Sequence, residues 1–201
     1  MIILYKNFFK RIFDIIFSVI LLPFVLIIIL IVGIIIKLED KGPIFYLSDR
    51  LGKDKKIFRM YKLRSMKVKA PDIRNKDGST FNSNDDPRLT RIGSFIRKNS
   101  IDELPQLINV LLGNMSFIGP RPDLPEHIDY YTKNDLRKLQ VLPGISGYNQ
   151  AFFRNSTSWK ERLENDVYYV ENVSLILDFK IVLKTIKTII LKEGVFVDSE
   201  E

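Results

Sequence analysis

The sequence predicts a mostly helical α+β protein with an N-terminal re-entrant membrane helix, a small β-hairpin and amphipathic helices at the membrane interface. Three patterns predict this architecture. Residues 15–36 form an apolar run without charges, two short β-prone segments follow it, and helical spacing of apolar residues returns in the second half of the chain. We therefore divide the 201 residues into a membrane-embedded helix, residues 1–36, and a folded domain, residues 37–201, that carries the interfacial helices.

Composition narrows the kinds of site that this chain can build. The sequence has no cysteine and a single histidine, His127. Thiolate catalysis, disulfides and cysteine-ligated metal centres are therefore excluded, a histidine-rich metal site is disfavoured, and a reducing compartment such as the cytoplasm suits the chain. The net charge of +7 favours anionic partners, such as phosphorylated small molecules or anionic lipid headgroups.

The apolar run is long enough to cross a membrane, but two features favour a helix that returns to the side from which it entered. Its 22 residues would make a helix of about 33 Å. Pro23 removes a backbone hydrogen bond inside the run and should break the helix. Basic residues flank the run at both ends, and basic flanks stay on the cytoplasmic side. These flanking residues are Lys6, Lys10, Arg11, Lys37 and Lys41.

Other interpretations of the apolar run remain. A single-pass anchor with a kink at Pro23 is the main alternative. A buried core helix is disfavoured because no other part of the chain is apolar enough to surround it. A secretory signal is disfavoured as well, since the run is longer than a usual signal core and no small-residue cleavage site follows it.

A β-hairpin is predicted directly after the membrane helix. Gly42-Pro43 is a turn signal. Residues 44–47 and 57–61 are β-prone and are separated by the polar loop 52–55, which is the pattern of two antiparallel strands. Residues 70–88 are rich in turn formers and polar side chains, so we expect a mobile surface loop there.

The stretch from residue 41 to residue 98 is strongly basic, with sixteen lysines and arginines against six acidic residues. A solvated basic surface explains many of these side chains. Contact with anionic lipid headgroups is a second interpretation, favoured by the neighbouring membrane segment and worth about 1 kcal/mol for each basic residue near the surface. Nucleic-acid binding ranks lowest, because no recognised nucleic-acid motif accompanies the charge.

The best-defined helix is predicted to begin after Ser100. Ser100 fits the N-cap position, and Glu103 three residues later completes a capping box. Pro105 lies early enough in the helix to be tolerated, and Gly113 ends the helix. Between them lies one apolar stripe at helical spacing. The stripe consists of Leu104, Leu107, Ile108, Leu111 and Leu112.

Asp102 and Glu103 place two adjacent carboxylates in the first turn of this helix. Glu103 can be explained as a cap alone, and the helix dipole favours an acid at position 102. The same position suits phosphate chemistry, because amides at a helix N-terminus bind phosphate and a carboxylate there can coordinate Mg²⁺ or attack phosphorus. From the residues alone both interpretations stay open. The stiff turn Pro120-Arg121-Pro122, which presents one guanidinium group, favours the second.

The C-terminal half is predicted to hold three helices. Residues 123–140 form a polar helix, in which His127 is expected to be a surface or hydrogen-bonded residue. Residues 158–170 form a second helix. Residues 174–192 form a basic amphipathic helix, which either packs on the core or lies in the membrane interface. One of its faces carries Lys180, Lys184 and Lys187, and another carries Leu177, Ile181, Ile186 and Ile190.

Short blocks spread over the chain resemble the bacterial sugar transferases, the small monotopic phosphoglycosyl transferases that include the undecaprenyl-phosphate bacillosamine-phosphate transferases. Each block is weak alone, but together they run from residue 10 to about residue 185 and are specific. The blocks are Lys10-Arg11-x-Phe13-Asp14, Gly42-Pro43-x-Phe45, Arg50-x-Gly52, Phe58-x-x-Tyr61-Lys62-x-Arg64-Ser65-Met66, Ser100-x-Asp102-Glu103-Leu104-Pro105-Gln106, Asn109-Val110-Leu111-x-Gly113-x-Met115-Ser116, Gly119-Pro120-Arg121-Pro122, Pro143-Gly144-Ile145-Ser146-Gly147, and Trp159 with Asp166-Val167-Tyr168-Tyr169-Val170.

The resemblance implies a transfer reaction at the membrane. Enzymes of this family move a sugar 1-phosphate from a UDP-sugar to undecaprenyl phosphate and release UMP, as the first membrane step of a surface glycan or glycoprotein glycan pathway. Residues 37–201 would then be a cytoplasmic catalytic domain. The re-entrant helix, broken at Pro23, would hold the enzyme as a monotopic protein on the cytoplasmic face of the bacterial inner membrane. The implied partners are the UDP-sugar, undecaprenyl phosphate and membrane lipid, and nucleic acid is not among them.

The resemblance also implies roles for individual residues. Asp102 would be the nucleophile and would form a covalent phosphosugar intermediate. Glu103 would act beside it in proton transfer or metal binding. Mg²⁺, held through Asp102, would neutralise the donor diphosphate. The phosphate-binding residues would be Lys62, Arg97, Arg121 and Arg154.

The chain departs from the family pattern in three places. Leu22-Pro23 stands where the family often has Ser-Pro, so the break lacks that serine hydroxyl unless Ser18 replaces it. Ser48 stands where glutamine is common. Gly147-Tyr148-Asn149-Gln150 replaces Gly-Trp-Ala-Gln in a region that can contact the donor sugar, which leaves the identity of the sugar open.

Two other functions stay open from the sequence. A membrane-anchored basic scaffold without catalysis would tolerate Asp102→Asn, whereas the transferase would lose UMP release. A hydrolase of polyprenyl diphosphates that used the same acids would release inorganic phosphate and would not depend on a UDP-sugar.

Overall fold

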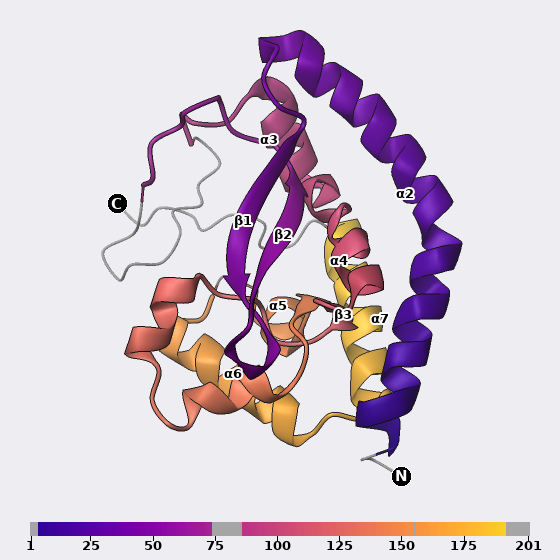
Figure 1. Cartoon of the computed structure of the whole chain (residues 1–201), viewed down its shortest axis with the longest axis vertical. Coiled ribbons are helices and arrows are strands. Elements are labelled where there is room, and N and C mark those ends of the chain that lie inside the picture. The colour runs from indigo at the N-terminus through magenta and orange to yellow at the C-terminus, as the bar shows by residue number, and fades with distance from the viewer. Residues whose placement is uncertain (1–3, 74–85, 155, 192–201) are drawn as a thin grey trace.

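A computed structural model describes residues 4–73, 86–154 and 156–191. One long helix, α2 (Lys10–Asp40), curves along one side of the molecule, and the other elements pack against its inner face (Figure 1). The mostly helical α+β architecture is therefore confirmed. In chain order the other helices and strands are β1 (Phe45–Leu51), β2 (Ile57–Leu63), α3 (Arg91–Lys98), α4 (Gln106–Leu112), β3 (Ser116–Ile118), β4 (Gly144–Ser146), α5 (Tyr148–Phe152), α6 (Trp159–Glu171) and α7 (Leu175–Leu191).

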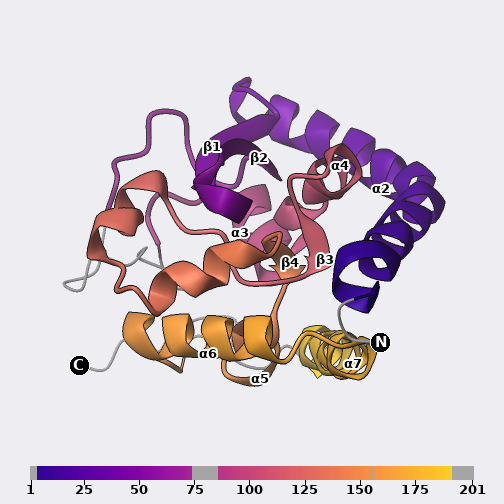
Figure 2. The same ribbon diagram turned by 60° about the horizontal axis from the view of Figure 1, so that its bottom comes forward.

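Helix α2 buries one face against the rest of the protein and exposes an apolar face on the other side. Pro23 lies inside it, and α2 continues through the proline as one helix whose path bends (Figure 2). Ser18 is fully buried, and its hydroxyl has no hydrogen-bond partner among the described residues, so it does not replace the missing serine. Large apolar side chains cover the outer face, for example Phe24 and Leu30, each 64% exposed. The inner face packs on β2, α3 and α4 through Val25, Ile29, Val32 and Ile36.

The N-terminal end of α2 is held to the domain by polar contacts. Arg11 donates hydrogen bonds to two carbonyl groups at the end of α4. Asp14 is buried and accepts a hydroxyl and an amide hydrogen bond from β3, both at 3.0 Å. Lys10 pairs with the buried Asp178 of α7. These contacts fix the start of α2 against three separate elements.

The C-terminal end of α2 is held to the same domain. Asp40 forms a two-point ion pair with Arg64, just beyond β2. The Glu39 carboxylate accepts the backbone N–H groups of Arg91 and Ile92, at 2.8 and 3.2 Å, and so caps the start of α3. A carboxylate at that position satisfies amides that have no partner within the helix. We call these contacts, together with those of Lys10, Arg11 and Asp14, the polar clamps of α2.

The predicted hairpin is confirmed. Strands β1 and β2 are antiparallel, with Phe45 opposite Leu63 and Leu51 opposite Ile57, and a short 3-10 turn joins them. Residues 74–85, most of the predicted 70–88 loop, lie outside the described residues. The side-chain amide of Asn109 in α4 accepts a hydrogen bond from the Tyr61 backbone at 3.0 Å and donates one to the strand. Helix α4 is thereby fixed in register with β2.

The C-terminal half agrees with the predicted helices in part. The single helix expected over residues 123–140 is wrong, since two 3-10 turns, Pro125–Tyr130 and Asp135–Gln140, replace it. They are separate because Tyr131 adopts an extended backbone between them. Helix α6 begins with a capping box between Ser158 and Glu161. A short parallel pair of strands, β3 and β4, was not foreseen from the sequence.

Helix α7 packs on the core, which confirms the first of the two interpretations left open for it, and its position in a membrane interface stays a prediction. Ile181 is fully buried in the core and Asp178 is 6% exposed. A second apolar stripe faces outward, and its members are 50–70% exposed. This stripe consists of Ile176, Phe179, Leu183 and Ile186.

Candidate active site

The two predicted carboxylates lie in a tight turn between α3 and α4, and not in the first turn of a capped helix. Ser100 adopts a left-handed backbone, with φ of 56°, and its side chain caps nothing. Residues Ile101–Glu103 then form a 3-10 turn, and the regular helix begins only at Gln106. The predicted capping box is therefore wrong, because the left-handed residue turns the chain before a helix can form. Gly113 ends α4 in a left-handed conformation, as predicted.

The predicted apolar stripe of α4 is wrong in part. Leu107 is buried, whereas Leu112 is 63% exposed. The inner face also carries the polar side chains of Gln106 and Asn109, which are buried at 3% and 0% exposure. Apolar spacing could not reveal them, since Asn109 lies on the buried face to make hydrogen bonds with β2 and Gln106 lies there beside the hollow.

The Glu103 carboxylate lies between two cationic side chains, Lys62 and Arg121. Its Oε1 atom lies 2.7 Å from Lys62 Nζ and 3.8 Å from an Arg121 guanidinium nitrogen. Burial opposes its ionisation, but the charge of Lys62, followed by that of Arg121, outweighs burial and lowers the pKa of Glu103 to about 2. Glu103 is therefore ionised at neutral pH and holds two cations in place.

The pKa of Asp102 is shifted in the opposite direction from that of Glu103. Asp102 is 6% exposed, and no described side chain pairs with its carboxylate. Burial raises the pKa of Asp102 to about 6, with the Lys62 charge opposing the rise and the Glu103 charge adding to it. Two neighbouring carboxylates whose pKa values are pushed apart are typical of a catalytic pair with divided roles.

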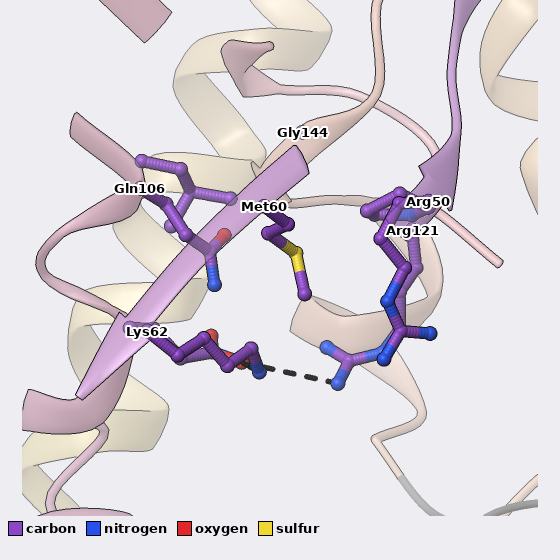
Figure 3. Close-up of a pocket in the computed structure, with 9 residues that line it drawn as sticks. Arg50, Met60, Lys62, Gln106, Arg121 and Gly144 are labelled. Atoms are coloured by element: carbon purple, nitrogen blue, oxygen red, sulfur yellow. Dashed lines mark hydrogen bonds and ion pairs between the residues drawn. The ribbon is translucent and has the colours of Figure 1, made fainter. Parts of the chain in front are cut away.

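A shallow hollow with an empty volume of about 250 Å³ opens beside Glu103, whereas the neighbouring Asp102 is buried and is not among the residues that line the hollow. Lys62 and Arg121 reach toward one another from opposite sides of it, and the Gln106 amide points into the same space (Figure 3). The hairpin, the start of α4, the proline-rich turn and β4 each contribute to the lining. The lining residues are Arg50, Met60, Lys62, Glu103, Gln106, Arg121, Pro122, Gly144 and Ile145.

The other two predicted phosphate-binding residues, Arg97 and Arg154, are not among the residues that line the hollow. Arg97 lies in the last turn of α3, close enough for its charge to lower the pKa of both Asp102 and Glu103. Arg154 follows α5 with a left-handed backbone and is not among the residues that line the hollow. His127 packs against Trp159, with ring centroids 5.4 Å apart, and is likewise absent from the lining.

Two residues of the hollow were not proposed from the sequence. Arg50, at the end of β1, adds a third cation to Lys62 and Arg121. Gln106 is 3% exposed, and its side-chain amide points into the hollow. Both stand in blocks that carried the family resemblance, Arg50-x-Gly52 and Leu104-Pro105-Gln106, and that was the only signal for them.

The site offers few protein ligands for a metal ion. Within the described ranges, no three histidine, aspartate or glutamate side chains come together as a metal cluster. Glu103 is committed to Lys62 and Arg121, whereas the Asp102 carboxylate pairs with no described cation. One free carboxylate suits Mg²⁺, which commonly takes one or two protein carboxylates and completes its shell with water and substrate phosphates.

Comparison with known proteins identifies the family. The sequence model of the bacterial sugar transferases matches residues 5–192, which is nearly the whole chain. The chain belongs to the bacterial sugar transferase family. It is therefore an enzyme of the transferase class, and the basic scaffold without catalysis is set aside.

Individual relatives of this bacterial sugar transferase cover much of its length. An uncharacterized sugar transferase of Bacillus subtilis, EpsL, is 42% identical over 161 residues, which are 80% of this chain and 77% of that protein. A UDP-N-acetylgalactosamine-undecaprenyl-phosphate N-acetylgalactosaminephosphotransferase of Aeromonas hydrophila is 41% identical over 167 residues, 80% of this chain and 38% of that protein. The exopolysaccharide production protein ExoY of Rhizobium meliloti is 36% identical over 171 residues, 80% of this chain and 76% of that protein. The chain thus spans about three quarters of some relatives and little more than a third of others.

Proposed function

We propose that this bacterial sugar transferase moves a sugar 1-phosphate from a UDP-sugar to undecaprenyl phosphate and releases UMP. The names of relatives support the substrate classes, since one is an undecaprenyl-phosphate galactose phosphotransferase and another a UDP-galactose-lipid carrier transferase. The observation that carries the proposal is the divided carboxylate pair beside a hollow lined by three cations. Cations placed in that way suit a diphosphate, and a carboxylate beside them suits attack on phosphorus.

The reaction would proceed in two steps. First, a carboxylate oxygen of Asp102 attacks the sugar-bearing phosphorus, the bond from that phosphorus to the bridging oxygen breaks, and UMP leaves with the electron pair. Second, an oxygen of the lipid phosphate attacks the same phosphorus, and Asp102 leaves as a carboxylate. The split lets a water-soluble donor and a membrane-bound acceptor use one site in turn. Arg50, Lys62 and Arg121 would stabilise the charge of the transferred phosphoryl group in both steps.

Glu103 fits the role of an organiser better than that of a base. A carboxylate with a pKa of about 2 takes a proton from a phosphate only weakly. Its contacts with Lys62 and Arg121 instead hold those cations at the hollow. We therefore assign Glu103 to the positioning of the cations, and the lipid phosphate would attack in its ionised form.

Mg²⁺ would be held by the Asp102 carboxylate together with the donor diphosphate. When bound it supplies positive charge to the phosphate oxygens. Because few protein carboxylates are available, we expect the metal to bind the enzyme and donor together, and only weakly in the absence of donor.

The membrane arrangement follows from the polar clamps of α2. This helix is long and apolar enough to cross a membrane, which is weak evidence by itself. The clamps attach both of its ends to one domain, through Arg11 and Asp14 at the start and Glu39 and Asp40 at the end. We propose that α2 enters the cytoplasmic leaflet of the inner membrane and returns, with its bend inside the lipid.

The outward stripe of α7 supports the same orientation. The N-terminal end of α2 lies next to α7 in both views (Figures 1 and 2), and each of these helices carries exposed apolar side chains. Apolar patches of this kind bordered by lysines suit a lipid interface. Thr185 of α7 also contacts Ser146 of β4 at 2.7 Å, next to the hollow. The lipid phosphate would then reach the hollow at headgroup height.

The proposal is tested by presenting a panel of UDP-sugars with undecaprenyl phosphate and Mg²⁺ to the purified enzyme. One donor should yield UMP and a lipid-linked product, and Asp102→Asn should abolish both. The exposed Asp129→Asn serves as the matched control and should keep full activity. Without acceptor, a donor radiolabelled in its sugar should label the protein, and Asp102→Asn should not be labelled.

Other results would reject parts of the proposal. UMP release that persists in Asp102→Asn would exclude the covalent step. Release of inorganic phosphate from a polyprenyl diphosphate, without any UDP-sugar, would identify a hydrolase instead.

A further inference from the structure

A buried ionic cluster lies directly behind the proline-rich turn. Asp123, the residue after Pro122, accepts hydrogen bonds from the Tyr131 hydroxyl at 2.6 Å, from Lys138 Nζ at 2.7 Å and from Arg162 at 2.9 Å. Lys138 is 2% exposed and also lies 2.7 Å from a carboxylate oxygen of Asp166 in α6. We call these five residues the Asp123 cluster.

Asp123 also joins the two segments of the chain that carry Arg50 and Arg121. The backbone carbonyl of Asp123 accepts the N–H of Leu51 at 2.9 Å. Leu51 follows Arg50, and Asp123 follows Arg121 by two positions. One residue therefore ties the backbone beside Arg50 to the backbone beside Arg121.

The turn before the cluster has little freedom of its own. Prolines on both sides of Arg121 fix two backbone angles. The Pro120 carbonyl accepts the N–H of Gly144 at 2.9 Å, and Gly119 donates to Ser146 at the same distance. A side chain at Gly144 would lie 2.1 Å from the Gly119 nitrogen, so this contact is too close for any other residue. Movement of Asp123 would thus be passed to Arg121 and not absorbed between them.

The Asp123 cluster is expected to add little to the free energy of unfolding, so its more important effect is to fix the geometry of the residues around it. Burying charged groups costs free energy that their attraction repays only in part, and well-packed apolar residues often do as well or better. Burial opposes ionisation of Asp123, yet Lys138, His127 and Arg162 hold its pKa well below the usual range. Two aspartates raise the pKa of Lys138 in spite of burial. Asp123 and Lys138 therefore both stay charged at neutral pH, and their ion pair keeps one fixed arrangement.

We propose that the Asp123 cluster positions Arg50 and Arg121 for a diphosphate, so that Asp123, Tyr131 and Lys138 are positioning residues of the transfer reaction. The inference rests on the proposed function for its substrate. It concerns residues that do not line the hollow. Loss of the cluster should weaken diphosphate binding through the two arginines and leave the Asp102 turn intact.

The test compares Tyr131→Phe and Lys138→Met with a matched control. Arg137→Gln breaks an exposed ion pair with Glu171, 2.6 Å long, that joins the same 3-10 turn and the same helix as the Lys138 to Asp166 contact. We expect Lys138→Met to lower kcat/KM for the UDP-sugar roughly tenfold or more, chiefly through KM, because small displacements of binding groups cost that much. Tyr131→Phe should lower it less, and Arg137→Gln should change it less than about twofold.

A double-mutant cycle separates positioning from a general loss of structure. In a background that carries both Arg50→Ala and Arg121→Ala, Tyr131→Phe should have little further effect on KM, since both arginines that it positions are gone. Additive effects in that background would overturn the proposal. If Lys138→Met does not fold, Tyr131→Phe alone still decides the question.

Binding of inorganic pyrophosphate keeps this test distinct from that of the proposed function. Calorimetry should show weaker pyrophosphate binding in Tyr131→Phe and Lys138→Met and unchanged binding in Arg137→Gln. That result would stand even if no UDP-sugar gave UMP. Equal pyrophosphate affinity in all the variants would reject the positioning role.

Discussion

At the scale of single residues, Asp102 and Glu103 differ in what surrounds them and not in their chemistry. Glu103 contacts two cations and is ionised, whereas Asp102 lies buried without a described partner. The proposed nucleophile is thus poorly solvated, beside a neighbour that is paired with two cations. This division makes the pH dependence of the enzyme informative about Asp102.

The first prediction concerns the acid side of the pH profile. The pKa of Asp102 is about 6, so kcat/KM for the donor should fall as the pH drops below about 6, where the nucleophile takes up a proton. Lys62 lowers that pKa. Lys62→Met should therefore move the acid limb to higher pH, besides reducing the rate. The exposed Lys98→Met is the control, and an unmoved limb in Lys62→Met would contradict the assignment.

The second prediction concerns stability at the same residue. A carboxyl group whose pKa is raised on folding binds its proton more tightly in the folded state, so its contribution to stability falls as the pH rises from about 4 to about 6. Asp102→Asn removes that penalty. We expect it to raise the free energy of unfolding at neutral pH by roughly 1–3 kcal/mol while abolishing activity.

Thermal unfolding at two pH values checks this second prediction. The gain of Asp102→Asn should shrink toward zero near pH 4, where the wild-type carboxyl is already protonated in the folded state. Asp129→Asn, at an exposed position, should show no such gain. An Asp102→Asn variant that is less stable than wild type at neutral pH would contradict the raised pKa of Asp102.

At this scale the sequence indicated the carboxylates, Lys62 and Arg121, because blocks of local sequence surround them. It did not indicate Arg50 or the amide of Gln106 as lining residues. Each reaches the hollow only through pairing of β1 with β2 or through the buried face of α4, and neither can be read from residue spacing. Pattern reasoning also treated Glu103 as a cap, since it could not see the left-handed Ser100.

At the scale of elements, close packing decides where the helices around the site lie. Alternation and turn chemistry predicted the hairpin, because those signals are local. They could not predict the β3–β4 pair, whose strands are three residues long and distant in sequence. Helix α3 is a similar case, since Gly93 packs on the Ser65 carbonyl and brings Arg97 to the carboxylates.

The third prediction follows from that contact. A side-chain carbon at position 93 would lie 1.8 Å from the Ser65 carbonyl oxygen, so Gly93→Ala must push α3 away. We expect a loss of about 1–3 kcal/mol in the free energy of unfolding. Helix propensity alone would predict a gain of about 1 kcal/mol for the same change. Activity should fall too, because Arg97 moves with α3.

Ser94→Ala, at the next position of α3, is the control for Gly93→Ala. It increases helix propensity without entering that contact and should leave both stability and activity near the wild-type values. Chemical unfolding in detergent micelles measures the first and UMP release the second. Equal stability of the two variants would show that α3 can shift without cost.

At the scale of the whole molecule, one domain holds both ends of α2, the helix that we propose enters the membrane. The clamps use charged side chains of α2 that would be costly to place in lipid, so each end belongs at the aqueous surface of the domain. In the proposed topology, the bend between them would reconcile an apolar length sufficient to span a membrane with two ends on the same side. Both basic flanks pointed to that arrangement in the sequence, but the contacts that support it join residues 24 to 168 positions apart and could not be foreseen.

The last prediction tests that topology directly. The chain has no cysteine, so a single cysteine reports one position. Lys6→Cys and Lys41→Cys lie at the two ends of α2, and the exposed Lys56→Cys marks the hairpin. A membrane-impermeant maleimide should label all three in inverted inner-membrane vesicles and none in intact spheroplasts, because the polar clamps keep both ends with the domain. Labelling of Lys6→Cys from the opposite side to Lys56→Cys would mean that α2 spans the bilayer, and the clamps at Arg11 and Asp14 could not then form.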